Sequence, residues 1–328
     1  MFFYILVLLW ILLGLYIARK TVYAYRVSHL SNQFMKEGKI DTTWYPFIRS
    51  DLNTLPSFPM IVLRAFFMGP IFMTSCLLAV VAAGICSLVL PAPWLVVATG
   101  LASRIICFCS GIRIRETGIR ASTSHAPCIV ANHNSAFDII ILLTKHYCFV
   151  SMEAVRTIPV VGTVAKALGC IFVARESKDS RSDAKAAIKE RLSSQVSGTC
   201  KNQPPLVVFP EGSTNNGHYL LQFRRGAFEA NVPIQPLFIE FQDHSLNFTI
   251  IRLSELTSLA CCLPGREVTL HWLPIIQPGG SPEELAAKAR DMIANCPSAY
   301  GHAPLIKADA SSHREAIAAA GFFRSIIS

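Results

Sequence analysis

A histidine and an aspartate separated by four residues, His133 and Asp138, are the first pair of side chains in this sequence that could do chemistry. They lie in the segment Asn-His-Asn-Ser-Ala-Phe-Asp, between an apolar run typical of a strand and one typical of a helix. With Ser135 as N-cap and Asp138 at the third helical position, the spacing predicts a capping box. The turn then brings His133 back towards Asp138.

A carboxylate that holds one imidazole nitrogen of His133 would fix the tautomer and make the other nitrogen a better base. Such a base could remove the proton of a weak nucleophile such as an alcohol. An ordinary helix cap with an unrelated histidine beside it explains the same spacing. This pair alone does not separate the two interpretations.

A second candidate is Glu211, which follows the apolar run Leu206–Phe209 and Pro210. The turn after it is rich in glycine, hydroxyl and amide side chains: Gly212, Ser213, Thr214, Asn215 and Asn216. Such a turn could present backbone N–H groups and side-chain donors to a phosphate or a hydroxyl. The same residue types are also common in plain strand-to-loop connections.

Two further segments carry weaker signals. Arg175 ends the apolar run Cys170–Ala174, where a guanidinium would suit a phosphate, although a surface ion pair with Glu176 is the simpler interpretation. Pro233 opens the segment Val232–Leu237, which is typical of a chain entering a buried strand. Core packing explains that segment without any functional role.

Short apolar runs alternate with helical stretches from about residue 111 onward. The runs expected to be strands are Pro127–Ala131, Cys148–Met152, Cys170–Ala174, Leu206–Phe209, Ile234–Glu240, Phe248–Ile251 and Val268–Trp272. Helices are expected at Ser180–Ser194 and Pro282–Ala294. This alternation predicts an α/β sheet domain.

The first third of the chain contains two long stretches without any charged residue. Phe2–Ala18 contains 17 apolar residues and is followed by Arg19, Lys20 and Arg26. The length is at the short end for a spanning helix, and the cations place its downstream end in the cytosol. We therefore predict a membrane anchor.

Residues 65–103 form a second uncharged stretch, 39 residues long. One helix of this length would extend ~58 Å, far beyond a ~30 Å hydrocarbon core. Because Pro91 and Pro93 interrupt it, we expect a long helix up to Leu90, a sharp turn and a shorter return segment. Arg104 and the arginines after it place the rest of the chain in the cytosol if these helices form a hairpin or a re-entrant pair.

The composition limits the partners. Hydrophobic residues make up 52% of the chain and charged residues 16%, with a formal net charge of +9. No helix-turn-helix, zinc-finger or RNA-binding motif accompanies this charge, so a membrane surface or a polyphosphate ligand such as CoA suits it better than nucleic acid. The eleven cysteines include no CxxC pair and no zinc spacing, which indicates reduced thiols and no metal site.

Taken in order, the four candidate segments resemble the glycerophospholipid acyltransferase family. Its signature is a His-x4-Asp block, a Phe-x-x-Arg block, a Phe-Pro-Glu-Gly block and a Val-Pro-x-x-Pro block, and here the blocks run from His133 to Pro236. The wider similarity, from near residue 60 to near residue 300, is greatest to the lysophosphatidylcholine and lysophosphatidylethanolamine acyltransferase branch. Each block alone is unspecific, whereas the ordered set is specific.

The resemblance implies roles for individual residues. His133 would be the general base and Asp138 its orienting partner. The implied acceptor-binding residues are Arg175, Glu211, Gly212, Ser213 and Thr214, and the supporting residues are Asn132, Phe209, Pro210 and Pro233. Ser213 stands where a threonine is usual and Asn215 replaces a second hydroxyl, which leaves the acceptor open.

The resemblance also implies an architecture: N-terminal membrane helices and a central, mainly parallel or mixed sheet flanked by helices. We expect an anchor at 1–26, a connector at 27–59, a membrane hairpin or re-entrant pair at 60–110, a cytosol-facing acyltransferase domain at 111–305 and a tail at 306–328. No loop of the calcium-binding DxDxDG type is present, so calcium regulation through one is not expected.

The implied activity is transfer of an acyl group from acyl-CoA, as co-substrate, to a lysophospholipid at the endoplasmic reticulum membrane, without a cofactor or metal. Lysophosphatidate or glycerol 3-phosphate is an alternative acceptor, which the pair Arg224–Arg225 would favour unless it is only a surface pair. A non-catalytic lipid-binding membrane protein is a third possibility.

Overall fold

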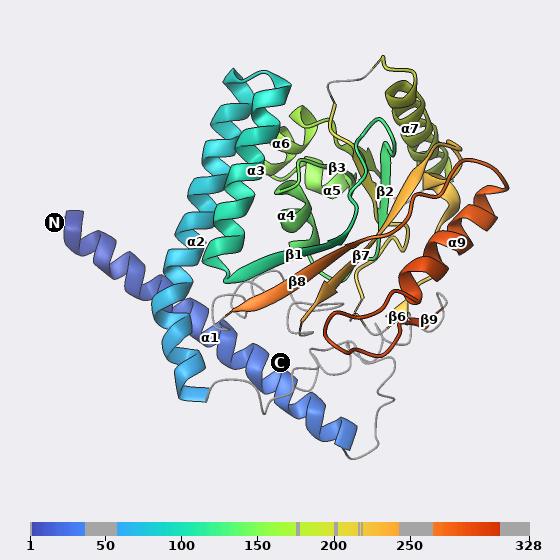
Figure 1. Ribbon diagram of the computed structural model, residues 1–328. Coiled ribbons are helices and arrows are strands. Elements are labelled where there is room, and N and C mark those ends of the chain that lie inside the picture. The colour runs from blue at the N-terminus through green and yellow to red at the C-terminus, as the bar shows by residue number, and fades with distance from the viewer. Residues whose placement is uncertain are drawn as a thin grey trace.

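The computed structural model describes residues 2–36, 58–174, 178–199, 203–215, 217, 219–242 and 265–308. A mixed sheet forms its centre, and helices cover both faces of the sheet (Figure 1). The long N-terminal helices lie on one side, and one of them extends away from the rest of the molecule (Figure 1).

Seven strands form the main sheet of the described part of the chain, in the order β1-β8-β7-β2-β5-β3-β4. Their bounds are β1 Ile112–Gly118, β2 Cys128–Ala131, β3 Cys148–Met152, β4 Ile171–Val173, β5 Leu206–Val208, β7 Ile234–Phe241 and β8 Arg266–Trp272. All neighbours are parallel except β7 and β8, which are antiparallel. The expected mainly parallel or mixed sheet is confirmed.

The alternation of side chains along the buried strands creates two cores. Ile129 of β2 and Val207 of β5 face a core shared with the N-terminal helices. Cys128 and Leu206, one residue earlier, face a second core on the other side of the sheet. Because both faces are covered, these strands consist almost wholly of apolar residues.

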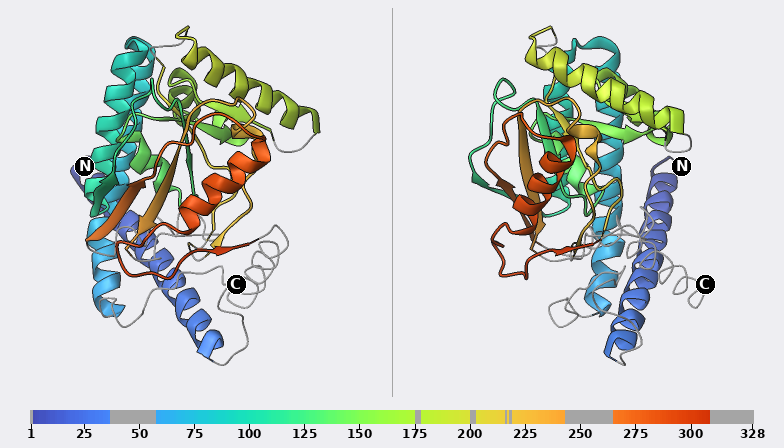
Figure 2. Two further views of the ribbon diagram at one scale, coloured as in Figure 1. Left: turned by 45° about the vertical axis from the view of Figure 1, so that its right-hand side comes forward. Right: turned by 90° about the vertical axis from the view of Figure 1, so that its right-hand side faces the viewer.

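Helices on the second face close the domain. They are α7 Lys178–Val196 and α9 Pro282–Ala294, and both contribute side chains to the second core (Figure 2). A capping box of Ser281 and Glu284 begins α9, which therefore has the bounds expected from the sequence. The other described helices after residue 110 are short. They are α4 Phe137–Leu143, α5 Glu153–Arg156, α6 Val161–Ala167 and the 3-10 turn η3 Arg225–Ala227.

The N-terminal third consists of α1 Phe2–Lys36, α2 Phe58–Val89 and α3 Ala92–Cys109. Within them Tyr4–Val22, Val62–Val89 and Ala92–Cys109 are long and apolar enough to cross a membrane. The expected long helix up to Leu90, the turn at Pro91 and the return helix are all present. Residues 27–36, expected in a connector, instead continue α1, and residues 37–57 lie outside the described part.

Small residues let α1 and α2 cross closely. Gly14 and Ala18 on α1 are four residues apart, as are Ala65 and Gly69 on α2. Gly14 lies against Phe66 of α2, and Ala18 and Ala65 belong to one buried cluster. A Cβ on Gly69 would lie 2.7 Å from Cγ2 of Ile17. This spacing of small residues is typical of helices that pack within a membrane.

The pair α2–α3 lies lengthwise along the α/β domain instead of projecting from it (Figures 1 and 2). At the turn end, a Cβ on Gly84 of α2 would lie 2.5 Å from Val160. Further along, His146 Nδ1 lies 3.1 Å from the Val96 carbonyl oxygen of α3. The helix pair and the domain therefore share one core.

Three features of the fold differ from the sequence expectations or lie beyond them. The edge strand β1 was not expected, because it is mostly exposed and lacks a buried apolar run. Residues 306–307, expected in the tail, form β9 and pair with β6 (Tyr219–Leu220), so the folded domain extends past residue 305. The strand expected at Phe248–Ile251 lies outside the described residues.

Candidate active site

His133 stands in the loop that follows the carboxyl end of β2, in the middle of the sheet. The preceding residue fixes this loop to the neighbouring strand β7. Asn132 Nδ2 donates to the Ile239 carbonyl oxygen at 3.0 Å, and the Ile239 N–H donates to Asn132 Oδ1 at 2.7 Å. Asn132 thus anchors the backbone next to His133.

Asp138 organises the turn between β2 and α4. Its Oδ2 atom accepts from His133 Nδ1 at 2.9 Å and from the N–H groups of Asn134 and Ser135, both at 2.8 Å. The side chain is 0% exposed. Three donors on one buried oxygen hold the side chain of Asp138 in one position.

The predicted capping box at Ser135 is only half formed. Asp138 does accept from the Ser135 N–H, but Ser135 Oγ accepts from the Phe137 N–H at 3.2 Å and not from Asp138. The N-cap is Ala136, so α4 begins one residue later than expected. The carboxylate is drawn instead into the turn, where it reaches the His133 ring.

The ring of His133 is held from two directions. Its Nδ1 faces Asp138, and its face stacks on Phe209 with centroids 4.1 Å apart and an interplanar angle of 15°. The side chain is 17% exposed, and no described residue makes a hydrogen bond to Nε2. With a proton on Nδ1 donated to Asp138, Nε2 is the unprotonated nitrogen and can act as a base.

Glu211 holds the backbone of His133 in place. Its Oε1 accepts from the His133 N–H at 2.8 Å, and its Oε2 accepts from Asn215 Nδ2 at 2.7 Å and the Leu221 N–H at 2.9 Å. The Asn215 N–H in turn donates to the His133 carbonyl oxygen at 3.0 Å. Both polar groups of the His133 peptide backbone are thus bound by this one turn.

Glu211 was expected to bind the acceptor, and the structure gives it a different position. It is 3% exposed and all three of its contacts are to the protein, so it supports His133 and does not face solvent. Burial raises the pKa of Glu211 to about 8, although the N–H donors of Leu221, His133 and Asn215 oppose the shift. A proton on either oxygen would compete with one of these donors.

Gly212 allows a close approach at the next position. Its φ of +71° is in the left-handed region, and a Cβ on it would lie 2.9 Å from Cζ of Arg224. The Arg224 N–H also donates to the Pro210 carbonyl oxygen at 2.9 Å. Gly212, Ser213 and Thr214 are half-buried, so this part of the turn, unlike Glu211, is accessible.

Of the residues implied by the resemblance, Pro233 is not brought to this site. Pro233 precedes β7 at the amino end of the strands, whereas His133 follows the carboxyl end of β2. The register shows this, because Ile234 pairs with Cys128 at the beginning of β2. Arg175 lies outside the described residues. The pair Arg224–Arg225 was interpreted either as a feature that favours an anionic acceptor or as a surface pair, and the structure places Arg224 against Gly212 in the turn after Glu211.

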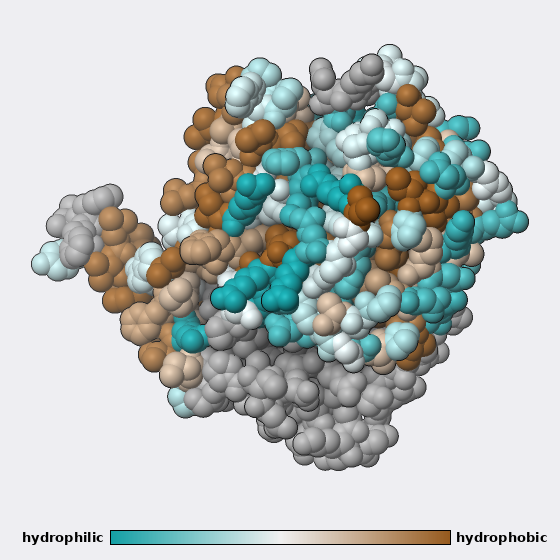
Figure 3. Space-filling view, viewed as in Figure 1, coloured by the Kyte–Doolittle hydropathy of each residue, from teal (hydrophilic) through white to brown (hydrophobic). Residues whose placement is uncertain are grey.

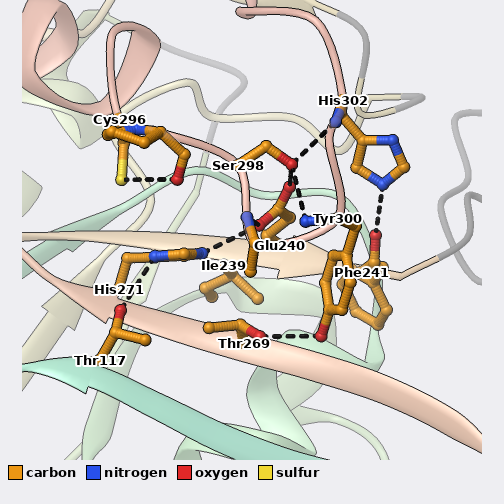
Figure 4. A network of polar contacts seen from close by, with 12 residues as sticks. Thr117, Ile239, Glu240, Phe241, Thr269, His271, Cys296, Ser298, Tyr300 and His302 are labelled. Carbon is orange, nitrogen blue, oxygen red and sulfur yellow. Dashed lines mark hydrogen bonds and ion pairs between the residues drawn. The ribbon is translucent and has the colours of Figure 1, made fainter.

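A second polar network lies beside the first, at the carboxyl end of β7 (Figure 4). Glu240 Oε2 lies 2.9 Å from His271 Nε2 and accepts from the Ala299 N–H at 2.8 Å, while Glu240 Oε1 accepts from Ser298 Oγ. His271 Nδ1 lies 2.9 Å from Thr117 Oγ1. This network fastens the segment after α9 to β7 and β8.

The segment fastened by this network also reaches the catalytic loop. A pocket at the end of β7 is lined by Asn134 and Gly217 on one side and by Cys296, Ser298 and His302 on the other. Burial opposes the charged form of His271, but its hydrogen bonds to Cys296 and Glu240 outweigh this and raise its pKa to about 9. The network therefore contains a buried ion pair at neutral pH.

Comparison with known protein families gives a match that includes this site. Residues 111–240 match the model of the family described as Acyltransferase. The matched segment contains His133, Asp138 and Glu211, and the match agrees with the resemblance of the sequence blocks.

The individual relatives that match this chain include lysophospholipid acyltransferases. The chain is 31% identical over 194 residues to the lysophospholipid acyltransferase LPEAT2 of Arabidopsis thaliana, a match that covers 58% of this chain and 35% of that protein. It is 34% identical over 193 residues to the lysophospholipid acyltransferase LPCAT4 of Homo sapiens, covering 56% of this chain and 35% of that protein. These matches span about a third of the length of the relatives.

A solved structure is also similar, that of the 1-acyl-sn-glycerophosphate acyltransferase PlsC from Thermotoga maritima. The similarity covers 68% of this chain and 94% of that one, with 19% sequence identity and a TM-score of 0.49.

Proposed function

We propose that this protein transfers a fatty acyl group from acyl-CoA to the free hydroxyl of a lysophospholipid, with lysophosphatidylcholine or lysophosphatidylethanolamine as the favoured acceptor. The observation that carries the proposal is the state of His133, whose Nδ1 is bound by a buried carboxylate while its Nε2 has no partner among the described residues. The names of the relatives, which are lysophospholipid acyltransferases, support the acceptor class.

In this mechanism the acceptor hydroxyl lies against Nε2 of His133. Nε2 takes the hydroxyl proton while the oxygen attacks the thioester carbonyl of acyl-CoA. The tetrahedral intermediate then breaks its C–S bond, so that the new ester forms and the CoA thiolate leaves and takes up a proton. The buried carboxylate of Asp138 stabilises the imidazolium that forms in between.

Glu211 and Asn215 contribute to this chemistry through the backbone of His133. Because they bind its N–H and its carbonyl oxygen, the backbone that carries the imidazole cannot move without breaking buried hydrogen bonds. Phe209 adds a flat surface on which the ring rests. The site is thus ordered before substrate arrives, which reduces the entropy lost in the reaction.

The membrane location is part of the proposal. Exposed apolar side chains cover the outer faces of the N-terminal helices, for example Leu8, Leu77 and Leu88 (Figure 3). Because α2 and α3 share a core with the catalytic domain, we infer that the domain rests against the membrane and receives acyl chains from it. We place the active site on the cytosolic side of the endoplasmic reticulum, where cations such as Arg19 and Arg104 are favoured.

A panel of acceptors tests this proposal. The full chain, purified in detergent or nanodiscs, is given labelled oleoyl-CoA with lysophosphatidylcholine, lysophosphatidylethanolamine, lysophosphatidate or glycerol 3-phosphate. We expect a labelled diacyl product with the first two acceptors. Faster turnover of lysophosphatidate or glycerol 3-phosphate would reject the acceptor, and absence of product with all four would reject acyl transfer itself.

A further inference from the structure

Two adjacent arginines beside the catalytic turn have different surroundings. Arg225 is held by two carboxylates, because its Nη1 lies 2.6 Å from Glu283 on α9 and its Nε lies 3.5 Å from Glu229. Glu229 also binds Lys185 of α7 at 2.8 Å. Arg225 is therefore part of a surface network that links α7, η3 and α9.

Arg224 has no such partner. Its side chain is exposed, and none of the described residues gives its guanidinium a carboxylate or another hydrogen-bond acceptor. Its backbone is extended at the N-cap of η3, and its N–H is bound to the Pro210 carbonyl oxygen. The main chain of Arg224 is thus fixed, while all the donors of its side chain remain available.

The guanidinium lies against the part of the site that is accessible. It packs on Gly212, where any side chain would collide with it. Gly212 directly follows Glu211, which binds the His133 N–H, and the same turn begins at Phe209, on which the His133 ring stacks. One short turn therefore connects this cation with the general base.

We propose that Arg224 binds the phosphate of the acceptor lysophospholipid, an inference that rests on the proposed function. A guanidinium presents a planar fork of donors that matches a phosphate group. In a 1-acyl lysophospholipid the phosphate ester is on the glycerol carbon next to the one that bears the free hydroxyl. A phosphate held at Arg224 would therefore bring that hydroxyl towards His133, with the hydroxyls of Ser213 and Thr214 beside the phosphate.

The phosphates of CoA are the other source of the same chemistry, and separate titrations distinguish the two. Arg224→Gln, Arg224→Lys and the matched control Arg225→Gln are prepared in the full chain. For each, KM and kcat are measured for lysophosphatidylcholine at saturating oleoyl-CoA, and then for oleoyl-CoA at saturating lysophosphatidylcholine. Because both arginines are exposed, thermal unfolding should be nearly the same in all variants.

We expect Arg224→Gln to raise KM for lysophosphatidylcholine about tenfold to a hundredfold, as for loss of a charge-assisted hydrogen bond, and to leave KM for oleoyl-CoA unchanged. Arg224→Lys should have a KM for lysophosphatidylcholine between those of the parent and Arg224→Gln, because lysine keeps the charge but lacks the planar fork of donors. Arg225→Gln should resemble the parent. A rise in KM for oleoyl-CoA alone, or equal kinetics of Arg224→Gln and Arg225→Gln, would overturn the inference, whereas an inactive parent would instead overturn the proposed function.

Discussion

Two histidines of this protein lie in almost the same immediate surroundings. His133 binds Asp138 at 2.9 Å and stacks on Phe209, and His271 binds Glu240 at 2.9 Å. His271 also stacks on a phenylalanine, Phe238, with centroids 5.4 Å apart. In both cases the carboxylate is buried and accepts further hydrogen bonds from backbone N–H groups.

The difference lies in the second ring nitrogen. His271 Nδ1 is bound to Thr117, so both of its nitrogens are used within the protein. His133 Nε2 has no partner among the described residues, and its side chain is 17% exposed against 9% for His271. A carboxylate–histidine pair is therefore not by itself a catalytic feature, and the accessible second nitrogen is what distinguishes the proposed base His133 from His271.

A large loss of activity is expected from Asp138→Asn. The amide oxygen can still accept from the three donors that now meet at Oδ2, with Nδ2 at the position of Oδ1, which has no hydrogen-bond partner among the described residues. The amide is neutral, however, so the ring would lose the carboxylate that stabilises its protonated form. We expect kcat to fall ~10²-fold or more, measured as acceptor-dependent release of CoA per folded molecule. The comparison would break if this variant kept a rate within a few-fold of the parent.

The opposite result is expected from His271→Gln. Removing one partner of a buried ion pair should lower the free energy of unfolding by about 3 kcal/mol, while kcat per folded molecule stays near the parent value. Thermal unfolding in detergent measures the first quantity and CoA release the second. A variant of normal stability with a large loss of kcat would assign His271 a catalytic role and contradict the comparison.

The pH dependence of the same pair sharpens this test. The pKa of His271 is raised to about 9, so its stabilising contribution is fully present below its ordinary pKa and is lost as the pH rises through about 9. Burial raises the pKa of Glu240, but hydrogen bonds from His271 and Ser298 lower it overall. The parent should thus lose more stability than His271→Gln between pH 7 and 10, and equal losses would contradict an ion pair.

The smallest effect is expected from the stacked rings. Phe209→Leu should lower kcat about 2- to 10-fold, since an aromatic contact contributes roughly 0.5–1.5 kcal/mol. Phe238→Leu is the matched control and should change stability without changing kcat. Equal kinetics of the two variants would mean that Phe209 does not orient the base.

The parts of the fold and site that the sequence predicts are those encoded by neighbouring residues. The apolar runs of β2 and β5 and the proline-marked turn at Pro91 are local signals, and so is the spacing of His133 and Asp138. Each of these depends on a few consecutive side chains, which is why periodicity and spacing found them.

What the sequence could not predict depends on contacts between distant segments. Glu211 is polar and follows a strand, which fits an acceptor ligand equally well, until the burial of its carboxylate against His133 is known. The unlike roles of Arg224 and Arg225 depend on Glu283, which lies far along the chain. The edge strand β1 could not be predicted, because its exposed positions carry polar side chains and it lacks a buried apolar run.

The most direct test of the central claim is the rate of acceptor-dependent CoA release by His133→Ala. It is measured beside His271→Ala and normalised to folded protein. If Nε2 of His133 is the general base, His133→Ala loses ~10²–10⁴-fold in kcat. The kcat of His271→Ala, calculated per folded molecule, should stay close to that of the parent. Release of CoA by His133→Ala at the parent rate would contradict the assignment.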